Sequence, residues 1–519
     1  MALRLIRRGT LMVLVVLASL SGPVAWQFRR TLAATFDPDS LRALAENPAL
    51  RALYGPPGPL ADPGGFTVWR TGMFAAVVLG VWSLMTATRI TRGEEEAGRW
   101  ALLLAARIRL PGLVGRHLCA LVVADVLIGG AVVGAMLLAR TQVRGSLLFG
   151  AGLALVGMVF AGVGTLAGQL FPSRRLAAGA AGGVLGVALL LRMAADGASG
   201  LSWLHWGTPF GLFAAVEPYG ADRVLPLAVL AGMGLVVGLV SVGAGWRRDL
   251  GAGWIPVRDR RRPRTLLLRR LGLFSLRRTL RGLIGWAVGV AAYFLLIGAL
   301  AKTLTKFLAG SPRYAEMAAQ AGFRGLATVE GYAAALLVLL AIPIGVYAAG
   351  RIGLTAADEG EGRMALLLSL PVSRLRWAGL EAGVTAVACS GLAAVAGLAL
   401  WAGTLLAGAP LGVGPSLAGA FNVLPVGLLC LGAAVLALGW APRLAVPVGS
   451  LPATGGFLLL VLADSFGWPA WVRQISPFAH VASVPSVPPD WPGTAGILGV
   501  AVLLAAVGGY GYSRRDLRG

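Results

Sequence analysis

Charged residues are scarce in this chain. Asp, Glu, Lys and Arg together make up 13% of its 519 residues, whereas 57% of the residues are hydrophobic. Because a soluble domain carries roughly a quarter charged residues, this composition excludes an ordinary soluble protein. A helix needs about 20 mostly apolar residues to cross about 30 Å of hydrocarbon, and apolar stretches of that length recur along nearly the whole sequence. The composition therefore predicts an all-α integral membrane protein.

Cysteine and histidine are also rare. The three cysteines, Cys119, Cys389 and Cys430, lie inside apolar runs without CxxC spacing. This pattern predicts small packing residues rather than a disulfide framework or a metal cluster. The three histidines are far apart in the sequence, so a metal site would require the fold to unite them. They are His117, His205 and His480. We expect no metal.

The sequence has no motif for binding or hydrolysing a nucleotide. A phosphate-binding loop has the pattern G-x-x-x-x-G-K-[ST], but neither of the two lysines, Lys302 and Lys306, follows a glycine. The G-x-S-x-G elbow and the H-E-x-x-H motif are missing as well. We therefore expect no enzyme and no cofactor bound to this chain.

Twelve apolar stretches are long enough to span a membrane. In the first half of the chain they cover 9–27, 68–88, 117–139, 146–170, 176–195 and 224–246. In the second half they cover 283–301, 329–350, 378–402, 416–440, 443–463 and 493–512. The loops on the side of the termini carry more Lys and Arg than the opposite loops, and the positive-inside rule then places both termini in the cytoplasm. We expect a multi-pass protein of the bacterial plasma membrane.

A basic stretch separates the sixth span from the seventh. The chain has a net charge of +23, and Arg258-Asp259-Arg260-Arg261-Arg262-Pro263-Arg264 is followed by an amphipathic basic segment through Arg281. Such a patch can bind nucleic acid. We favour a cytoplasmic linker that touches anionic lipid headgroups, with membrane lipid and no nucleic acid as partner.

Three sequence landmarks recur in the same order and at nearly the same spacing in the two halves. The first half has Gly98–Leu104, Trp203 followed by Thr208-Pro209-Phe210, and Arg247–Leu250; the second has Gly362–Leu368, Trp471 followed by Ser476-Pro477-Phe478, and Arg514–Leu517. Such self-similarity indicates a repeated structural unit. Six spans per copy give both copies one orientation, so we predict two parallel six-helix repeats, 1–250 and 283–519, joined by a linker at 251–282. A transport path commonly follows the axis between such halves.

Both halves carry an acidic turn after their second span, on the side where basic residues are expected. The turns read Arg92-Gly93-Glu94-Glu95-Glu96-Ala97-Gly98-Arg99 and Asp358-Glu359-Gly360-Glu361-Gly362-Arg363. Each runs into a helix with one apolar stripe, at about 97–109 and 361–372, which suits the membrane interface. The candidate functional residues are Glu94, Glu95, Glu96, Gly98, Arg99, Trp100, Glu359, Glu361, Gly362, Arg363 and Met364.

Two explanations of the acidic turns are open. Glu95/Arg99 and Glu359/Arg363 have the spacing of ordinary i,i+4 ion pairs on a helix. Alternatively, the turns form a docking surface for a cytosolic partner with basic or backbone-donor groups, which we favour because it explains acid on the inner face. Pro111 and Pro371 are expected to end the two helices.

The order of these motifs resembles the permeases of type-2 ATP-binding-cassette (ABC) exporters. The resemblance rests on the E-E-x-G-R step after the second span, the amphipathic helix that follows, and the P-F motif before the sixth span. The W-R-R-D-L-G-A-G-W, S-P-F-A-H and R-R-D-L sequences are similar to those of fused twelve-span actinobacterial permeases of the polyketide or tetronasin antibiotic-exporter type. The resemblance covers essentially the whole chain.

The resemblance implies the permease subunit of an exporter for a hydrophobic or amphipathic small molecule, drug-like or lipid-like. It also implies that the helices at about 97–109 and 361–372 are coupling helices seated on two copies of a cytosolic ABC ATPase, which would bind ATP and Mg²⁺. The family pattern Pro371-Val372-Ser373-Arg374 reads Ala106-Arg107-Ile108-Arg109 in the first half. The two coupling sites therefore need not be equivalent.

Ionisable residues inside the spans are a further group of functional candidates. Asp125 is the clearest, because an apolar run separates it from the end of the third span. A proton relay needs such a group, so a proton-coupled secondary transporter of the major facilitator type is the alternative function. An aspartate bonded to a neighbouring helix explains Asp125 equally well. Arg192, Glu381 and Asp464 lie nearer the span ends, and we expect them to snorkel toward water.

Overall fold

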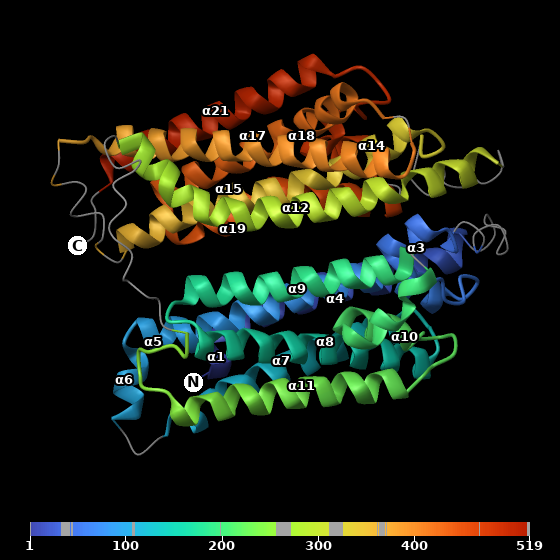
Figure 1. Cartoon of the computed structure of the whole chain (residues 1–519), viewed down its shortest axis with the longest axis horizontal. Helices are drawn as coiled ribbons and strands as arrows, with labels where there is room; N and C mark the ends of the chain where they lie inside the picture. Colours follow the sequence, from blue (N-terminus) through green and yellow to red (C-terminus); the bar gives the residue numbers. More distant parts are fainter. Residues whose placement is uncertain are drawn as a thin grey trace. The chain divides into compact units, whose positions relative to one another are not determined.

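The computed structural model describes residues 2–32, 42, 45–105, 109–197, 199–255, 271–310, 325–360, 362, 369, 371–409, 411–466 and 468–515. All regular structure in these residues is helical (Figure 1). Twelve helices are long and apolar enough to cross a membrane, and each overlaps one of the twelve predicted spans. The prediction of an all-α integral membrane protein is confirmed.

The chain folds as two compact units, Met1–Arg262 and Pro263–Gly519, each with six spanning helices. The spans of the first unit are α1 (Ala2–Gln27), α4 (Pro63–Thr88), α7 (Leu110–Leu138), α8 (Val143–Leu170), α9 (Arg174–Gly197) and α11 (Leu225–Gly243). Those of the second are α12 (Leu271–Ala309), α14 (Val329–Leu337) continuing through η5 (Val338–Leu340) into α15 (Ala341–Gly360), α17 (Arg374–Leu406), α18 (Val413–Trp440), α19 (Ala445–Phe466) and α21 (Trp491–Arg514).

The end of the predicted linker is helical. The amphipathic segment expected up to Arg281 is the first part of the 39-residue helix α12, which begins at Leu271 and continues directly into the seventh span. The basic stretch at 258–264 lies outside the described residues.

In each unit the fourth spanning helix lies at the centre of the helix packing. Helix α8 packs against α4, α7 and α11, and its Phe149 and Phe160 are buried in an apolar cluster. Helix α18 packs against α15, α17, α19 and α21, with Val426 and Cys430 buried. The two units therefore bury the same element of the repeat.

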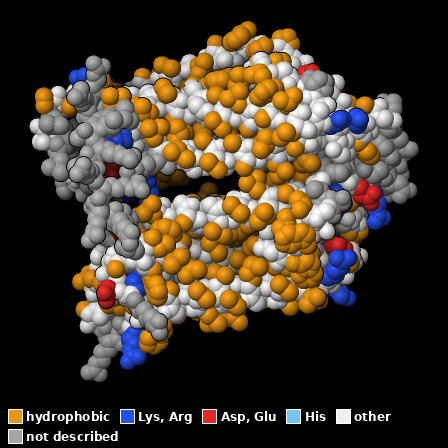
Figure 2. Space-filling model, in the orientation of Figure 1, with side chains coloured by type: hydrophobic (Ala, Val, Ile, Leu, Met, Phe, Trp, Pro, Cys, Tyr) orange, Lys and Arg blue, Asp and Glu red, His pale blue; other side chains and the backbone are white. Residues whose placement is uncertain are grey.

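The outer surfaces of the spans are apolar. Figure 2 shows hydrophobic side chains over the flanks of the helices, whereas Lys, Arg, Asp and Glu gather at the helix ends. Exposed tryptophans also lie near helix ends, including Trp26 in α1, Trp440 in α18 and Trp491 in α21. Tryptophan is enriched at membrane–water interfaces, so this distribution fits helices whose flanks face lipid.

The repeated Pro–Phe landmark forms a similar cap in both units. The Thr208 side chain accepts a hydrogen bond from the Gly211 N–H (3.0 Å), and the Ser476 side chain accepts one from the Phe478 N–H (3.3 Å). The next phenylalanine is buried in each case: Phe210 packs against Phe160, and Phe478 against Phe457. The recurring hydroxyl therefore starts a short helix that holds an aromatic ring against its unit.

One cysteine differs from its predicted environment. Cys389 and Cys430 are buried as predicted, but Cys119 is exposed. It lies on the face of α7 that also exposes Val123 and Val126. Because lipid is as apolar as the protein interior, an apolar run in the sequence does not indicate which of its residues face protein and which face lipid.

Pairs of glycines four residues apart bring helices into close contact in some spans and not in others. A Cβ atom at Gly164 would lie 2.7 Å from the Leu84 carbonyl oxygen of α4, and one at Gly234 would lie 2.8 Å from Met158. By contrast, Cβ atoms at Gly182 and Gly285 would meet open space. Four-residue glycine spacing thus marks helix contacts in α8 and α11 but not, among the described residues, in α9 and α12.

These contacts predict unequal effects of adding one methyl group. Gly164→Ala should lower the free energy of unfolding by about 1–3 kcal/mol, because α4 and α8 must move apart to admit the methyl group. Gly182→Ala, the control, should leave it unchanged or raise it. Unfolding in mixed detergent micelles measures both; equal effects of the two variants would contradict the α4–α8 contact.

Candidate functional site

The acidic turn of the first unit continues directly from its second span. After α4 the chain forms η2 (Arg89–Gly93), α5 (Glu94–Glu96) and α6 (Arg99–Leu104). Gly98 separates α5 from α6 with a left-handed φ of +72°, and its N–H donates to the Glu95 carbonyl oxygen (2.9 Å). A residue with a side chain is strained at such a φ, so glycine is the residue suited to this turn.

The predicted helix at 97–109 is therefore shorter in the structure. Helix α6 has six residues, and residues 106–108 lie outside the described part of the chain. Pro111 does not end this helix; it lies in the first turn of α7, where the missing proline N–H costs no helical hydrogen bond.

The three consecutive glutamates of the turn have three different partners. Glu94 forms a two-point ion pair with the exposed Arg99 (2.5 and 2.7 Å). Glu96 accepts the backbone N–H of Arg174 (2.7 Å), at the first residue of α9. Negative charge at a helix N-terminus is favourable because the first N–H groups lack helical partners. Glu95 points inward, and its side chain is only 2% exposed.

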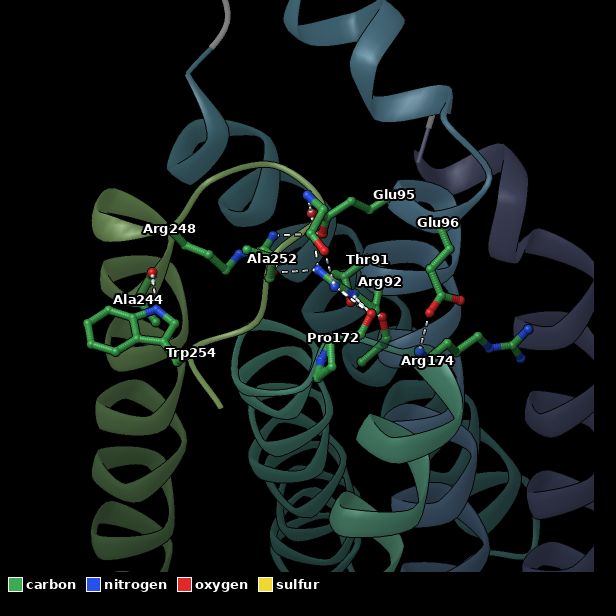
Figure 3. A network of polar contacts seen from close by, with 12 residues as sticks. Thr91, Arg92, Glu95, Glu96, Pro172, Arg174, Ala244, Arg248, Ala252 and Trp254 are labelled. Carbon is green, nitrogen blue, oxygen red and sulfur yellow. Dashed lines mark hydrogen bonds and ion pairs between the residues drawn. The ribbon is translucent and has the colours of Figure 1, made fainter. Parts of the chain in front are cut away.

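Glu95 is the centre of a buried ion cluster (Figure 3). Its carboxylate lies 3.1 Å from Nη1 of Arg92 and 2.6 Å from Nη2 of Arg248, and it accepts the N–H of Gly251 (2.7 Å). Arg92 also donates to the carbonyl oxygens of Pro172 (Nε, 3.0 Å) and Ala252 (Nη1, 2.9 Å). The cluster thus joins the turn after span 2, the loop between spans 4 and 5, and the segment after span 6.

The second unit contains the same turn with a matching ion pair. Gly362 has a φ of +72°, and its N–H donates to the Glu359 carbonyl oxygen (3.0 Å). The Glu359 carboxylate pairs with Arg515, whose carbonyl oxygen accepts a hydrogen bond from Nη1 of Arg374 (2.6 Å). Glu361, Arg363 and Met364 lie outside the described residues, and of the helix expected at 361–372 only residues 362, 369, 371 and 372 are described.

The structure therefore connects two landmarks that the sequence shows only as separate repeats. The glutamate of each acidic turn, Glu95 or Glu359, binds the second arginine of the R-R-D-L sequence that follows the sixth span of its unit, Arg248 or Arg515. Sequence reasoning missed this pairing. The recurrence of both landmarks in both halves was the available signal, but nothing local in the sequence indicates that they meet.

The i,i+4 pair proposed for Glu95 and Arg99 is wrong, because Arg99 pairs with Glu94 while Glu95 turns inward. The indole of Trp100 is buried as well, against Leu113, Val114 and the His117 ring. The large side chains that α6 exposes are Arg99 and Leu102, the latter 78% exposed. Hydrogen bonding to Glu94 raises the pKa of Arg99 above its ordinary value, so this arginine remains charged.

The intramembrane charges are more buried than expected. Asp125 is fully buried; Oδ1 accepts the Ser83 hydroxyl of α4 (2.8 Å), and Oδ2 has no partner among the described residues. Arg192 does not snorkel: it pairs with Asp196 (2.6 Å) and donates to carbonyls that end α3 (Pro48–Tyr54). Glu381 is also buried, in an ion cluster of the second unit. The Asp464 side chain is outside the described set.

The histidines have separate partners. His117 bonds to the Leu113 carbonyl, His205 to Asp196 and His480 to the Gln474 carbonyl. Among the described residues, no group of three or more His, Cys, Asp or Glu side chains could hold a metal ion.

Comparison with known proteins gives one family. Residues 268–513 match the model of the C-terminal domain of the multidrug efflux system permease Rv1217c. The whole chain is similar to the multidrug efflux system permease protein Rv1217c of Mycobacterium tuberculosis, with 30% identity over 521 residues that cover 96% of this chain and 91% of that protein.

The ion cluster predicts that neighbouring glutamates differ sharply in importance. Glu95→Ala should lower the free energy of unfolding by about 3–5 kcal/mol, because it leaves two buried arginines without their counter-charge. Glu94→Ala should cost no more than about 1 kcal/mol, because its partner is exposed. Unfolding in mixed micelles compares the two; similar costs would show that Glu95 is not the centre of the cluster.

Proposed function

This chain belongs to the family of multidrug efflux system permeases that includes Rv1217c, and we propose that it is the membrane subunit of an ATP-driven exporter. ATP would be hydrolysed by two copies of a cytosolic ABC ATPase, which also hold the Mg²⁺. The exported molecule is hydrophobic or amphipathic, in the size range of an antibiotic or a lipid. Both termini and both acidic turns lie in the cytoplasm of a bacterial cell, with the spans in the plasma membrane.

One observation carries this proposal: the same Glu-x-x-Gly turn, tied down by the same glutamate–arginine pair, occurs after the second span of both units. If two copies of an ATPase drive a chain that has no phosphate-binding loop, each copy needs an equivalent contact on that chain. The two turns supply these two contacts. In the first unit the buried ion cluster holds the base of the turn, while α6 presents Arg99 and Leu102 outward.

The turns would act as rigid contacts for the ATPase subunits. When ATP draws two such subunits together, the displacement reaches the permease at α6 and at the equivalent segment of the second unit. Because Arg92 and Glu95 fasten the first turn to two other connections between spans, α6 cannot shift without moving span ends with it. The substrate would enter from the inner leaflet.

In this mechanism the acidic residues have unequal roles. Glu95 and Glu359 position the turns, since they are turned toward arginines of their own unit. Arg99 and the exposed leucine of α6 contact the ATPase directly. Gly98 and Gly362 allow the left-handed bend that begins each contact segment.

A proton-coupled transporter is the second candidate, favoured by Asp125 alone. Its carboxyl group is fully buried between α4 and α8, with one oxygen unbonded among the described residues and the other bonded to Ser83. A buried carboxyl of this kind is costly to keep unless it is used. The hydrogen bond to Ser83 also fits a structural role in the exporter.

The docking role of α6 predicts a local effect on assembly. Leu102→Ser should reduce co-purification with the ATPase encoded beside this chain by tenfold or more, about 1.4 kcal/mol or above, if Leu102 is a central contact. Leu138→Ser is the matched control, because Leu138 is 87% exposed at the opposite end of α7. Undiminished assembly of Leu102→Ser, or equal loss in the control, would contradict the assignment.

The two candidate functions also differ in their energy source. We expect ethidium efflux from cells to require the ATPase partner and to survive Asp125→Asn, because Asn fills the same space and keeps a hydrogen bond to Ser83. Transport into ATP-free vesicles under an imposed pH gradient, abolished by Asp125→Asn, would instead establish the proton-coupled mechanism.

A further inference from the structure

The second unit contains a chain of ion pairs around the buried Glu381 that has no counterpart at the corresponding place among the described residues of the first unit. Glu381 on α17 accepts the Ser275 hydroxyl of α12 (2.7 Å) and a hydrogen bond from Nη2 of Arg351 on α15 (3.0 Å). Arg278 of α12 lies 3.7 Å from the same carboxylate oxygen and 3.1 Å from Asp358 at the end of α15. The side chains of Glu381 and Arg351 are 1% and 5% exposed.

This chain of charges begins beside the acidic turn of its unit. Asp358 directly precedes Glu359, which pairs with Arg515 at the base of the turn. From Asp358 the contacts run to Arg278 and on to Glu381, so they connect the turn with α12 and α17, the seventh and ninth spans. Arg278 also lies over the buried Trp377 ring of α17, 5.7 Å from its centroid.

The corresponding place in the first unit is apolar. Ala87 corresponds to Arg351 in the repeat, because it precedes Gly98 by as many residues as Arg351 precedes Gly362. The residues of spans 1, 2 and 3 that meet there form a buried apolar cluster. Its members are Ile6, Ala87, Ile90, Ala120, Leu121, Ala124 and, from span 4, Ala161. The acid that corresponds to Asp358 is Glu94, which pairs with the exposed Arg99 instead.

Stability alone does not explain this difference. Replacing a buried ion pair by apolar side chains of similar volume is often neutral or stabilising, because the ions no longer lose hydration. The first unit shows that the fold accommodates apolar packing at this place. Ion pairs differ from apolar contacts in that each charge binds one particular group on another helix. Arg278, for example, lies between two acids, Asp358 and Glu381.

We propose that Asp358, Arg278, Glu381 and Arg351 are positioning residues that transmit movement of the second unit's acidic turn to α12 and α17. The first unit transmits through its Arg92–Glu95–Arg248 cluster to the connections after spans 4 and 6 instead. The two ATPase contacts therefore drive different helices, although the turns themselves are alike. This inference rests on the proposed function, because the movement it describes is the one that ATP would cause.

The test compares three variants in the complex with the ATPase. Arg351→Met with Glu381→Leu removes one pair at similar volume and leaves Arg278 beside Asp358. The single variants Arg351→Met and Glu381→Leu each remove one partner of this buried pair and keep the other. Arg42→Gln with Glu46→Gln is the control, since it removes an exposed ion pair of 3.4 Å without changing the net charge. Thermal unfolding and amide hydrogen exchange, with and without a non-hydrolysable ATP analogue, provide the readouts.

We expect the single variants to unfold at lower temperature than wild type, and the double variant at the same temperature or higher. In wild type and control, the nucleotide should change exchange near Glu359 and in α12 and α17. In the double variant the change near Glu359 should persist, while that in α12 and α17 falls at least fivefold, about the lower end of measured coupling between sites.

Two results would overturn the inference: a full nucleotide response of α12 and α17 in the double variant, or a double variant as destabilised as the single ones. The second result would assign the cluster to packing. A wild-type complex that does not assemble, or that shows no nucleotide response at any site, would contradict the proposed function itself. Failure of the proposed function can be told apart from failure of the inference, because it is seen in the wild-type complex before any variant is compared.

Discussion

The glutamate–arginine pair at the base of each acidic turn is the interaction on which the rest of the candidate site depends. A buried carboxylate such as that of Glu95 is costly without a counter-charge and hydrogen bonds, and Arg248 after the sixth span supplies the counter-charge. The partly buried Glu359 pairs with the equivalent Arg515. In each unit, the pair therefore holds the segment after the sixth span against the turn after the second span. In the first unit this leaves α6 with a buried tryptophan on one side and an exposed leucine on the other.

Around this shared pair the two units have diverged. The first unit adds Arg92, which binds three carbonyl oxygens from two distant segments, and Glu96, which caps α9. The second unit has Gly360 where the first has Glu96, and places its additional charges among the spans around Glu381. A fused chain permits this divergence, because each half can change without altering the other, whereas two copies of one short chain would change together.

The sequence was sufficient to predict the twelve spans, because apolar length and composition determine membrane insertion. The repeat likewise located both acidic turns. The sequence did not predict which charges would be buried. Glu94, Glu95 and Glu96 are adjacent and chemically identical, yet Glu94 pairs with the nearby Arg99, whereas Glu95 and Glu96 have partners up to 156 and 78 residues away. Arg192 and Glu381 were misjudged for the same reason, since distance from a span end does not reveal a partner on another helix.

The most direct measurement of the central claim is site-specific photo-crosslinking from position 102. A photoreactive residue in place of Leu102 should crosslink to the ATPase subunit in the assembled complex. The yield should fall when Glu95→Gln weakens the ion cluster that holds α6 in place. Crosslinking to lipid alone, or a yield that is independent of Glu95, would show that the turn held by the glutamate–arginine pair is not the contact between permease and ATPase.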